Sequence, residues 1–261
     1  MENMKRILSY ARRAIDDYDM IKDGSKIAVG VSAGKDSLTL LCAMAELRRF
    51  YPKKFELCAI TVNMGFEGMD LSPVRELCDR LGVEYHVLDT QIAKVIFEVR
   101  QEKNPCSLCA KMRRGALYGY ARELGCDTVA LGHHFDDVVE TFMLNLFFEG
   151  RLGCFQPVTY LSNTGITLIR PMIYMPEKDV RYFSSKNDLP VVKSPCPADG
   201  NTEREEMKKL LNSLERENKG LRYRIFGAIQ RGEIDGFREM GRMESVKNYY
   251  PDDTDGDKVD N

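Results

Sequence analysis

The chain has no long hydrophobic run. No stretch of its 261 residues approaches the roughly 18–20 consecutive apolar residues that a membrane-spanning helix needs. The first 20 residues also lack the apolar core and the small-residue cleavage site of a secretory signal peptide. These absences predict a cytoplasmic globular protein with no membrane partner, for which 43% hydrophobic and 30% charged residues are ordinary values.

A large net charge of one sign is also missing. The formal net charge is −2, but the C-terminal stretch PDDTDGDKVDN alone contributes −4, so the rest of the chain is slightly basic, at +2. Basic clusters at residues 111–114 and 222–224 can therefore form a local positive face. The overall charge permits a nucleic-acid partner without requiring one.

Cysteine, by contrast, is plentiful. Eight cysteines in a chain without a secretion signal favour metal or redox chemistry over a disulfide framework. Four of them lie inside apolar helix or strand patterns, where a free cysteine behaves as a small core residue: Cys42, Cys58, Cys78 and Cys126. Cys106, Cys109 and Cys196 lie outside such patterns and are candidates for chemistry.

Apolar runs alternate with amphipathic segments along the first 150 residues. A helix is predicted at residues 4–15, followed by buried strands at 26–31, 56–63, 84–89 and 127–132 and intervening helices at 36–49, 73–81, 107–124 and 137–150. Ser72 and Gly82 are the predicted caps of the 73–81 helix. Strands that alternate with helices predict an α/β fold, in which crossover connections build a parallel sheet with helices on both faces.

The alternation weakens after Gly150. The segment ITLIRPM (166–172) is the last predicted strand, and PEKDVRYFSSKNDLP (176–190) is a short predicted helix with proline in its first turn. Residues 202–231 are predicted to form two charged helices divided by Gly220. From about residue 246 the chain is acidic and poor in aromatics, which is typical of a disordered tail.

The stretch GVSAGKDSLTLL (30–41) follows the first predicted strand. Loops at the carboxyl ends of parallel strands commonly bind ligands. Small residues let the backbone approach a phosphate, while Ser32 and Ser37 add hydroxyl donors and Lys35 adds a positive charge. The loop is not a Walker A loop, because three residues rather than four separate its glycines and an aspartate follows the lysine. On this evidence alone, a phosphate loop and an ordinary strand-to-helix turn both remain open.

A second polar motif, LGHHFDDVVET (131–141), follows the fourth predicted strand. Its two carboxylates, Asp136 and Asp137, lie at a helix start and can hold Mg²⁺ against a pyrophosphate. Helix capping is the alternative, since aspartate commonly offsets the helix dipole there. The two roles stay equally open for Asp136, whereas function is favoured for Asp137.

Together these motifs resemble the PP-loop ATP pyrophosphatases: SAGKDS after the first strand, a second strand ending near Asn63, and GHHFDD after the fourth. Residues 105–150 narrow the resemblance to the TtcA-like tRNA 2-thiocytidine synthetases, and the similarity covers roughly residues 20–200. It implies an adenine-nucleotide alpha-hydrolase-like PP-loop domain at 23–200. The residue patterns outside it predict an N-terminal helix at 1–22, a helical C-terminal extension at 201–245 and an acidic tail at 246–261. The family loop usually reads Ser-Gly-Gly-Lys-Asp-Ser, so Ala33 is a departure. If that position needs a positive φ, alanine costs about 1 kcal/mol or more there.

Cys106 and Cys109 form a C-x-x-C at a helix start, so both sulfurs can reach one metal or cluster, and the helix N-terminus lowers thiol pKa values. Cys196 lies in a rigid loop between two prolines. The resemblance implies that these three cysteines hold a 4Fe-4S cluster and leave one iron without a protein ligand. Zinc is the alternative, with Cys154 or His133 as a fourth ligand, because structural zinc usually has four ligands and no second C-x-x-C exists.

Three cations, Lys111, Arg113 and Arg114, follow the C-x-x-C on the same predicted helix. Cations near a helix N-terminus are unfavourable, which points to a negative partner. Arg113, one turn beyond Cys109, is predicted to face the ATP phosphates or a bound RNA. A solvated helix face is the alternative for Lys111 and Arg114.

The resemblance also implies a reaction. ATP adenylates the base oxygen of a cytidine in a tRNA anticodon loop, and sulfur carried on the open iron then replaces AMP. The departing pyrophosphate is expected to lie against Ser32, Ala33, Gly34, Lys35, Asp36 and Ser37. Asp36 and Asp137 are expected to hold Mg²⁺ or to orient the reacting groups. Arg113 is the expected phosphate contact, and the nucleotide is expected to lie beside Asn63, Gly132 and His133.

Two alternatives remain open at this point. One is a PP-loop enzyme that thiolates another base or a small molecule, and the other is a zinc-stabilised nucleotide-binding module without catalysis. The expected partners are tRNA, a sulfur donor such as a cysteine desulfurase or sulfide, and a second copy of the chain in a homodimer. Because no appended RNA-binding domain is evident, RNA contact is expected from the main domain and the 202–231 helices.

Overall fold

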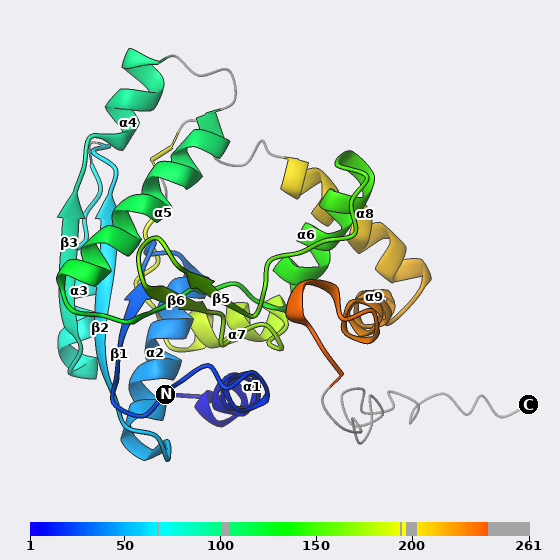
Figure 1. Cartoon of the computed structure of the whole chain (residues 1–261), viewed down its shortest axis with the longest axis horizontal. Helices are drawn as coiled ribbons and strands as arrows, with labels where there is room; N and C mark the ends of the chain where they lie inside the picture. Colours follow the sequence, from blue (N-terminus) through cyan, green and yellow to red (C-terminus); the bar gives the residue numbers. More distant parts are fainter. Residues whose placement is uncertain (67, 101–104, 194, 197–202, 240–261) are drawn as a thin grey trace, which may run out of the picture.

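The computed structural model of the chain describes residues 1–66, 68–100, 105–193, 195–196 and 203–239 (Figure 1). Six strands form one sheet: β1 (Ser25–Gly30), β2 (Phe55–Asn63), β3 (Glu84–Asp89), β4 (Thr128–Ala130), β5 (Val158–Leu161) and β6 (Ile166–Ile169). The α-helices are α1 (Met4–Asp17), α2 (Lys35–Phe50), α3 (Ser72–Leu81), α4 (Ile92–Lys94), α5 (Pro105–Glu123), α6 (Phe135–Phe148), α7 (Glu177–Lys186), α8 (Glu203–Glu217) and α9 (Leu221–Arg231). A π-helical turn, η1 (Val95–Val99), continues α4, and a 3₁₀ turn, η2 (Ile234–Gly236), follows α9.

The strand order of the sheet is β3-β2-β1-β4-β6-β5. All neighbouring strands are parallel except β5, which runs antiparallel to β6 at one edge. The chain order reverses between β1 and β4, because β2 and β3 lie on one side of β1 and β4 and β6 on the other. In open α/β sheets ligands bind at the carboxyl ends of the strands at such a reversal. The loops that follow β1 and β4 therefore meet where a ligand is expected.

Helices cover both faces of the sheet, as the sequence predicts (Figure 1). On one face α2 packs between the sheet and the helices α1 and α7, and its residues 37–45 are buried on every side. This double burial explains why α2 is apolar around its whole circumference. On the other face α5 places Leu117 and Ala121 against Cys58 and Val129 of the sheet. The four cysteines assigned to the core, Cys42, Cys58, Cys78 and Cys126, are all buried, which confirms that prediction.

The helices α8 and α9 pack against α6, on the opposite side of the molecule from β3 and α3 (Figure 1). Phe135 at the start of α6 contacts two rings of α9, with centroid separations of 4.7 Å to Tyr223 and 4.9 Å to Phe226. Gly220 adopts φ 80° between α8 and α9, a conformation that suits glycine and lets the chain reverse. The predicted division of residues 202–231 at Gly220 is therefore confirmed.

Two local expectations were wrong, the Ser72 cap and the end of the last strand, and two elements were not predicted at all. Ser72 is the first residue of α3 rather than its cap, since Leu71 holds the N-cap position and the Ser72 hydroxyl donates to Asp70 Oδ1 at 2.7 Å. The segment 92–99 forms α4 and η1, and residues 158–161 form β5, neither of which was predicted. The last predicted strand, 166–172, ends at Ile169. Gly82, in contrast, ends α3 with φ 61°, as predicted.

No helix in the described ranges combines the length and the apolar character that crossing a membrane requires. The predicted disordered tail, residues 246–261, lies outside the described residues.

Candidate active site

The loop after β1 makes a sharp turn before α2 begins at Lys35. Val31 still pairs with β2 through a 2.8 Å hydrogen bond from its N–H to the Ile60 carbonyl. Ala33 then adopts φ 60°, with its side chain fully buried, and its carbonyl accepts a 3.0 Å hydrogen bond from the N–H of Val192. Ala33 therefore adopts the left-handed conformation, which is unfavourable for alanine.

Two hydroxyl groups close this loop on itself. Ser37 Oγ donates to the Gly34 carbonyl at 3.0 Å and accepts from the N–H of Ser32 at 3.1 Å. The Ser32 hydroxyl lies 3.2 Å from that of Ser37. No side chain of the described residues caps the N-terminus of α2. The first N–H groups of this helix are therefore available to an anion such as a phosphate.

Lys35 lies between two carboxylates, with its Nζ 3.0 Å from Asp36 Oδ2 and 3.2 Å from Glu177 Oε1. Burial acts to lower the pKa of Lys35, but these two carboxylates outweigh it and raise the pKa. Glu177 also accepts hydrogen bonds from Arg181 at 2.7 Å and Lys208 at 3.0 Å. Burial acts to raise the pKa of Glu177, but those hydrogen bonds and the charge of Lys35 hold it well below its usual range. Lys35 is therefore a cation held beside the loop by Asp36 and Glu177.

Asp36 has one carboxylate oxygen without a hydrogen bond. Its Oδ1 is buried, has no partner among the described residues, and lies 3.6 Å from His134 Nε2. A buried acceptor without a partner is uncommon in native structures, and a divalent cation is one physical reason for it. The oxygen donor therefore fits Mg²⁺, which takes one or two protein carboxylates together with substrate phosphates.

Gly132 brings the second motif into contact with the first. A Cβ atom at this position would lie 3.1 Å from the backbone carbon of Asp36 and 3.1 Å from the backbone nitrogen of Ser37. Real Cβ atoms rarely approach backbone so closely, so any side chain here would push the loop after β4 away from the first turn of α2 by a few tenths of an ångström. The two motifs that the sequence placed at neighbouring strand ends thus touch at the sheet edge.

His134, not an aspartate, is the N-cap of α6. Its Nδ1 accepts from the N–H of Asp137 at 3.3 Å, while Asp137 Oδ2 accepts from the N–H of His134 at 2.9 Å. The other oxygen of Asp137 pairs with Arg204 at 3.1 Å. Burial acts to raise the pKa of Asp137, but the neighbouring histidines, His134 first, outweigh it and lower the pKa. Asp137 therefore completes the helix cap, the role that sequence reasoning had ranked second for it.

Asp136 faces the C-terminal part of the chain. Its Oδ2 accepts a 2.7 Å hydrogen bond from the N–H of Glu177 at the start of α7, and its Oδ1 lies 3.2 Å from Arg222 of α9. Arg222 is buried and also lies 3.6 Å from Glu140, one turn further along α6. Asp136 thus ties α7 and α9 to the N-terminal end of α6.

His133 is half-buried against an aromatic ring. Its imidazole lies 4.8 Å from the ring of Phe155, and its Nδ1 has no hydrogen-bond partner among the described residues. Burial lowers the pKa of His133 to about 4, so the imidazole is neutral near pH 7. A neutral imidazole with an unused ring nitrogen can still hydrogen-bond a ligand.

Asn63 ends β2 and organises the loop behind it. Its Nδ2 donates to Asp89 at 2.8 Å, and its Oδ1 accepts from the N–H of Gly65 at 3.1 Å. The side chain that was expected beside the nucleotide is therefore engaged within the protein, linking the ends of β2 and β3.

The cysteines of interest gather at the start of α5. Cys109 Sγ lies 3.5 Å from Met64 Sδ, just beyond β2, and Cys106 is exposed. Burial raises the pKa of Cys109, the guanidinium of Arg113 acts to lower it, and the nearby Cys196 and Cys106 side chains act to raise it. The three cysteines and Arg113 therefore lie within electrostatic reach of one another.

Three thiols within electrostatic reach of one another are a donor set that fits an iron–sulfur cluster. Across the described residues, no three His, Cys, Asp or Glu side chains are arranged to hold a single ion. In an iron–sulfur cluster each thiolate binds its own iron, so the ligands are spaced further apart. Cys154, the cysteine considered as a zinc ligand, is engaged elsewhere, with its Sγ 3.4 Å from the Val138 carbonyl.

Comparison with known proteins decides the family. A family model described as a PP-loop domain matches residues 5–215. The chain belongs to the PP-loop family. Its relatives include the tRNA-cytidine(32) 2-sulfurtransferase of Geobacter sulfurreducens, which is 40% identical over 228 residues that cover 86% of this chain and 89% of the relative. The enzyme of the same name from Pseudomonas putida is 39% identical, covering 87% of this chain and 83% of the relative.

Among solved structures, the U34-tRNA thiolase NcsA from Methanococcus maripaludis, with its 4Fe-4S cluster, is similar to this chain with a TM-score of 0.71 and 29% identity. The similarity covers 86% of this chain and 78% of the thiolase. The predicted α/β fold, a PP-loop sheet with helices on both faces, is therefore confirmed.

Sequence reasoning missed several charged residues around the PP-loop. Glu177, Arg204 and Arg222 all lie after residue 150, where no motif marks them, yet they contact Lys35, Asp137 and Asp136 respectively. The only signal was the dense charge of the predicted helices at 176–190 and 202–231. Such charge is ordinarily a solvated surface.

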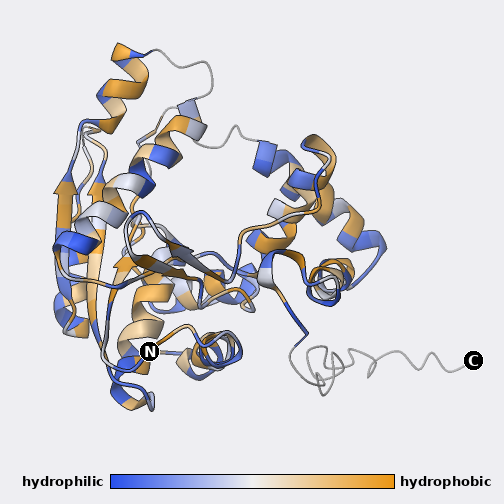
Figure 2. Ribbon diagram, viewed as in Figure 1, coloured by the Kyte–Doolittle hydropathy of each residue, from blue (hydrophilic) through white to orange (hydrophobic). Residues whose placement is uncertain are grey.

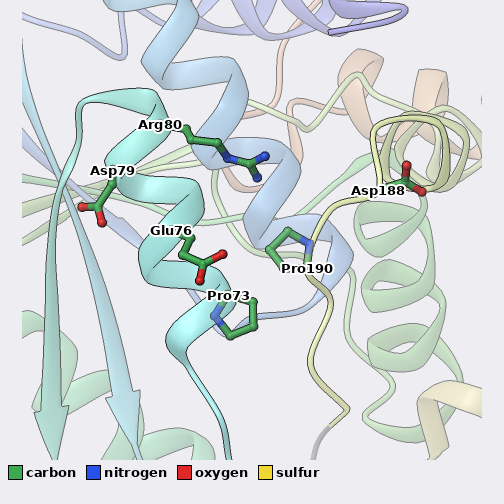
Figure 3. Close-up of a pocket in the computed structure, with 6 residues that line it drawn as sticks. All are labelled: Pro73, Glu76, Asp79, Arg80, Asp188 and Pro190. Atoms are coloured by element: carbon green, nitrogen blue, oxygen red, sulfur yellow. The ribbon is translucent and has the colours of Figure 1, made fainter.

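A shallow pocket between α3 and residues 188–190 is a poor candidate for the nucleotide (Figure 3). Its lining carries three carboxylates, Glu76, Asp79 and Asp188, but only one guanidinium, Arg80. This excess of negative charge repels the phosphates of ATP and RNA. The loop after β1, with Lys35 and the uncapped N-terminus of α2, is the better candidate for the phosphates.

Proposed function

We propose that this PP-loop chain transfers sulfur to C2 of a cytidine in tRNA, using ATP and a 4Fe-4S cluster and releasing AMP and pyrophosphate. The observation that supports it most is that an uncapped helix N-terminus after β1 and three thiols close to one another lie at the carboxyl edge of one sheet. Relatives about 40% identical over most of both chains are named tRNA-cytidine(32) 2-sulfurtransferases, which supports cytidine 32 as the base.

The PP-loop is proposed to bind the phosphates of ATP. The N–H groups at the start of α2 and the charge of Lys35 face the position of the phosphates, and Asp36 supplies an oxygen to Mg²⁺ through its unpaired Oδ1. Small side chains at Ala33 and Gly34 let the phosphates approach the backbone, and Ser32 and Ser37 hold the loop closed. The nucleoside part is proposed to lie toward His133 and Gly132, on the β4 side, and toward the end of β2 at Asn63.

Activation makes the oxygen of the base a leaving group. The base oxygen O2 forms a bond to the α-phosphorus of ATP as the bond to pyrophosphate breaks. Lys35 and the N-terminus of α2 offset the negative charge that develops on the departing pyrophosphate. When sulfur then bonds to C2, the carbon–oxygen bond breaks and AMP leaves with that oxygen.

Cys106, Cys109 and Cys196 are proposed to hold the cluster. When bound, a cluster with three protein ligands supplies one open iron that can carry the sulfur to be transferred. Arg113, exposed and within electrostatic reach of Cys109, is proposed to contact the phosphate of the activated base or of the RNA backbone.

Metal analysis of anaerobically purified protein tests the ligand assignment. We expect iron and sulfide near four per chain in the wild type, a large loss of both in Cys109→Ser, and no loss in Cys154→Ser. The second variant is a matched control, because a serine hydroxyl can replace the Cys154 thiol as donor to the Val138 carbonyl. Stoichiometric zinc that Cys154→Ser removes would instead support the zinc-stabilised module.

Pyrophosphate release tests the substrate. We expect release that depends on unmodified tRNA and that is lost when cytidine 32 is replaced by uridine, together with 2-thiocytidine in the digested product. Release that responds to no tRNA, or that persists without cytidine 32, would favour the alternative of another base or a small molecule.

The domain boundaries, the place of action, the sulfur donor and the oligomeric state are also proposals. We propose the boundaries 1–22, 23–200, 201–245 and 246–261, a cytoplasmic site of action where tRNA is available, and a cysteine desulfurase or sulfide as sulfur donor. A homodimer is proposed through the exposed apolar side chains at the end of α6 and just beyond it: Leu146, Phe147, Phe148 and Leu152. Sedimentation of the wild type and a Phe148→Ser variant tests the dimer.

A further inference from the structure

A second hollow opens directly beside the cysteine site. It lies between the loop after β2, the segment α4–η1 after β3, and Pro195, the neighbour of Cys196. Its side chains of interest are Phe66, Gln91, Lys94 and Phe97. Figure 2 shows that the α4–η1 segment beyond β3 is largely hydrophobic although it projects from the end of the sheet.

Residues that line this hollow contact a neighbour of the cysteine site, Met64. Met64, whose sulfur lies 3.5 Å from Cys109 Sγ, accepts a 2.9 Å hydrogen bond at its carbonyl from the N–H of Ala93. Ala93 lines the hollow, and so does Gly65, which follows Met64 in the chain. An occupant of the hollow would therefore lie next to whatever reacts at the cysteines.

The walls suit a flat, uncharged, partly polar molecule. The rings of Phe66 and Phe97 have centroids 6.0 Å apart with an interplanar angle of 52°, and both are only partly buried. The exposed side chain of Gln91 offers both a hydrogen-bond donor and an acceptor. Lys94 and Glu98, both exposed, bring charges of opposite sign, so the hollow is close to neutral. A neutral aromatic site fits a nucleobase better than a phosphate, since every base has a π-face that stacks on such rings.

Close contacts join the two sides of this hollow. Gly65 adopts φ 86°, and a Cβ atom there would lie 2.7 Å from the Thr90 carbonyl, so no other residue fits without a shift. Asn63 accepts from the N–H of Gly65, and the Thr90 hydroxyl donates to the Asn63 carbonyl at 2.8 Å. The loop that carries Phe66 is thereby fixed to the segment that carries Phe97.

We infer that this hollow binds the nucleobase adjacent to the one that is thiolated, stacked on one of the two tilted rings, Phe66 or Phe97, with its edge against the other. The inference rests on the proposed function, because it assumes that a single-stranded RNA reaches the cysteine site. Splaying a neighbouring base into a fixed pocket orients the reacting base and lets the protein select the anticodon loop over paired RNA.

Binding of a synthetic anticodon stem-loop with cytidine at position 32 to the cluster-loaded protein tests this inference. We expect Phe97→Ala and Phe66→Ala each to weaken binding between about 5-fold and about 150-fold, the range found when a stacking side chain is removed. Phe97→Tyr is expected to keep wild-type affinity. Tyr160→Ala is the matched control, because Tyr160 is 66% exposed on β5, the opposite edge strand, and is expected to have no effect.

Abasic RNAs locate the base that occupies the hollow. We expect Phe97→Ala to lose its effect on an RNA that is abasic on one side of cytidine 32 and to keep it on an RNA abasic on the other side. An equal effect on both abasic RNAs, or a loss of ATP affinity without a loss of RNA affinity, overturns the inference. If the wild type neither binds nor thiolates the stem-loop, the proposed function itself fails, which is a distinct result.

Discussion

Replacing Glu140 by Gln is expected to remove a pH-dependent penalty on the folded state. The Glu140 side chain is 4% exposed on α6, one turn after Asp137. Arg222 and Arg204 lie 3.6 Å and 3.8 Å from its carboxylate oxygens, but its Oε1 has no hydrogen bond in the described part of the chain. Burial and the negative charge of Asp137 raise the pKa of Glu140 to about 7.

The sign of the effect follows from proton binding. The pKa of an unfolded glutamate is 4.5, so between pH 4.5 and about 7 the folded chain holds more protons at Glu140 and its stability falls as the pH rises. A difference of about 2.5 in pKa corresponds to about 3 kcal/mol, fully present above pH 7. His133 acts oppositely, because burial lowers its pKa from 6.5 to about 4, and stability rises with pH across that range. The two slopes largely offset each other in the wild type.

Comparing the variant with the wild type isolates the contribution of Glu140. We expect the free energy of unfolding of Glu140→Gln minus that of the wild type to increase by about 2–3 kcal/mol between pH 5 and pH 8. Urea unfolding of cluster-loaded protein, followed by far-ultraviolet circular dichroism, measures this difference. The control is Glu206→Gln, since Glu206 is 71% exposed on α8. A difference that stays flat for Glu140→Gln would refute the reasoning.

Three further substitutions probe the PP-loop. Gly132→Ala forces a Cβ to 3.1 Å from the backbone of Asp36 and is expected to cost about 1–3 kcal/mol and to weaken ATP binding in equilibrium dialysis, with iron content unchanged. For Ala33→Gly, we expect a free energy of unfolding in urea within about 1 kcal/mol of the wild type. Glycine relieves about 1–2 kcal/mol of backbone strain, but the variant loses a buried methyl group and its unfolded chain is more flexible, which offsets that gain. Glu177→Gln leaves Lys35, Arg181 and Lys208 without their shared carboxylate. We expect it to lower the free energy of unfolding by about 2 kcal/mol at pH 7, which is less than for a fully buried ion pair because these cations are partly exposed. That loss should shrink progressively as the pH falls below about 4.5, since a glutamate with a lowered pKa stabilises the fold fully above its unfolded pKa and less and less as the pH falls toward its folded pKa.

The order of the secondary-structure elements was predictable because it depends on local patterns. The α2 helix, predicted at 36–49, spans Lys35–Phe50, and β2, predicted at 56–63, spans Phe55–Asn63. Both are strongly apolar segments of the length expected for their type, which leaves little room for a different assignment. The meeting of the loops after β1 and β4 followed from the rule for ligand sites in open parallel sheets.

Features that depend on distant contacts were not predictable. Arg222 reaches Asp136 across 86 positions of the chain, and nothing in either local sequence marks the pair. His134 caps α6 although histidine is not among the preferred cap residues, because Asp137 three positions later completes the reciprocal hydrogen bonds. The α4–η1 segment has apolar residues at helical spacing, Ile92, Val95, Ile96 and Val99, so a helix was predictable there and was missed, whereas its π-helical turn was not predictable from that pattern.

The two aspartates proposed for Mg²⁺ differ in what they have available. Asp36 has a buried oxygen without a partner, whereas both oxygens of Asp137 are engaged, one with the N–H of His134 and one with Arg204. Because Mg²⁺ commonly takes one or two carboxylates plus substrate phosphates and water, Asp36 can suffice as a direct ligand, with Asp137 positioning His134 behind it. We therefore expect Asp36→Asn to lower Mg²⁺-dependent pyrophosphate release at least about 100-fold.

The matched Asp137→Asn variant is expected to lower that release less than 10-fold, because an asparagine oxygen can still accept from the His134 N–H and preserve the cap. The two variants are compared as a function of Mg²⁺ concentration, which separates a direct ligand from a positioning residue. A direct ligand shifts the concentration of Mg²⁺ needed for half-maximal release, whereas a positioning residue lowers the maximum without that shift. The reverse ranking of the two variants would contradict the assignment and make Asp137 the metal ligand, with Arg204 displaced when the ion binds.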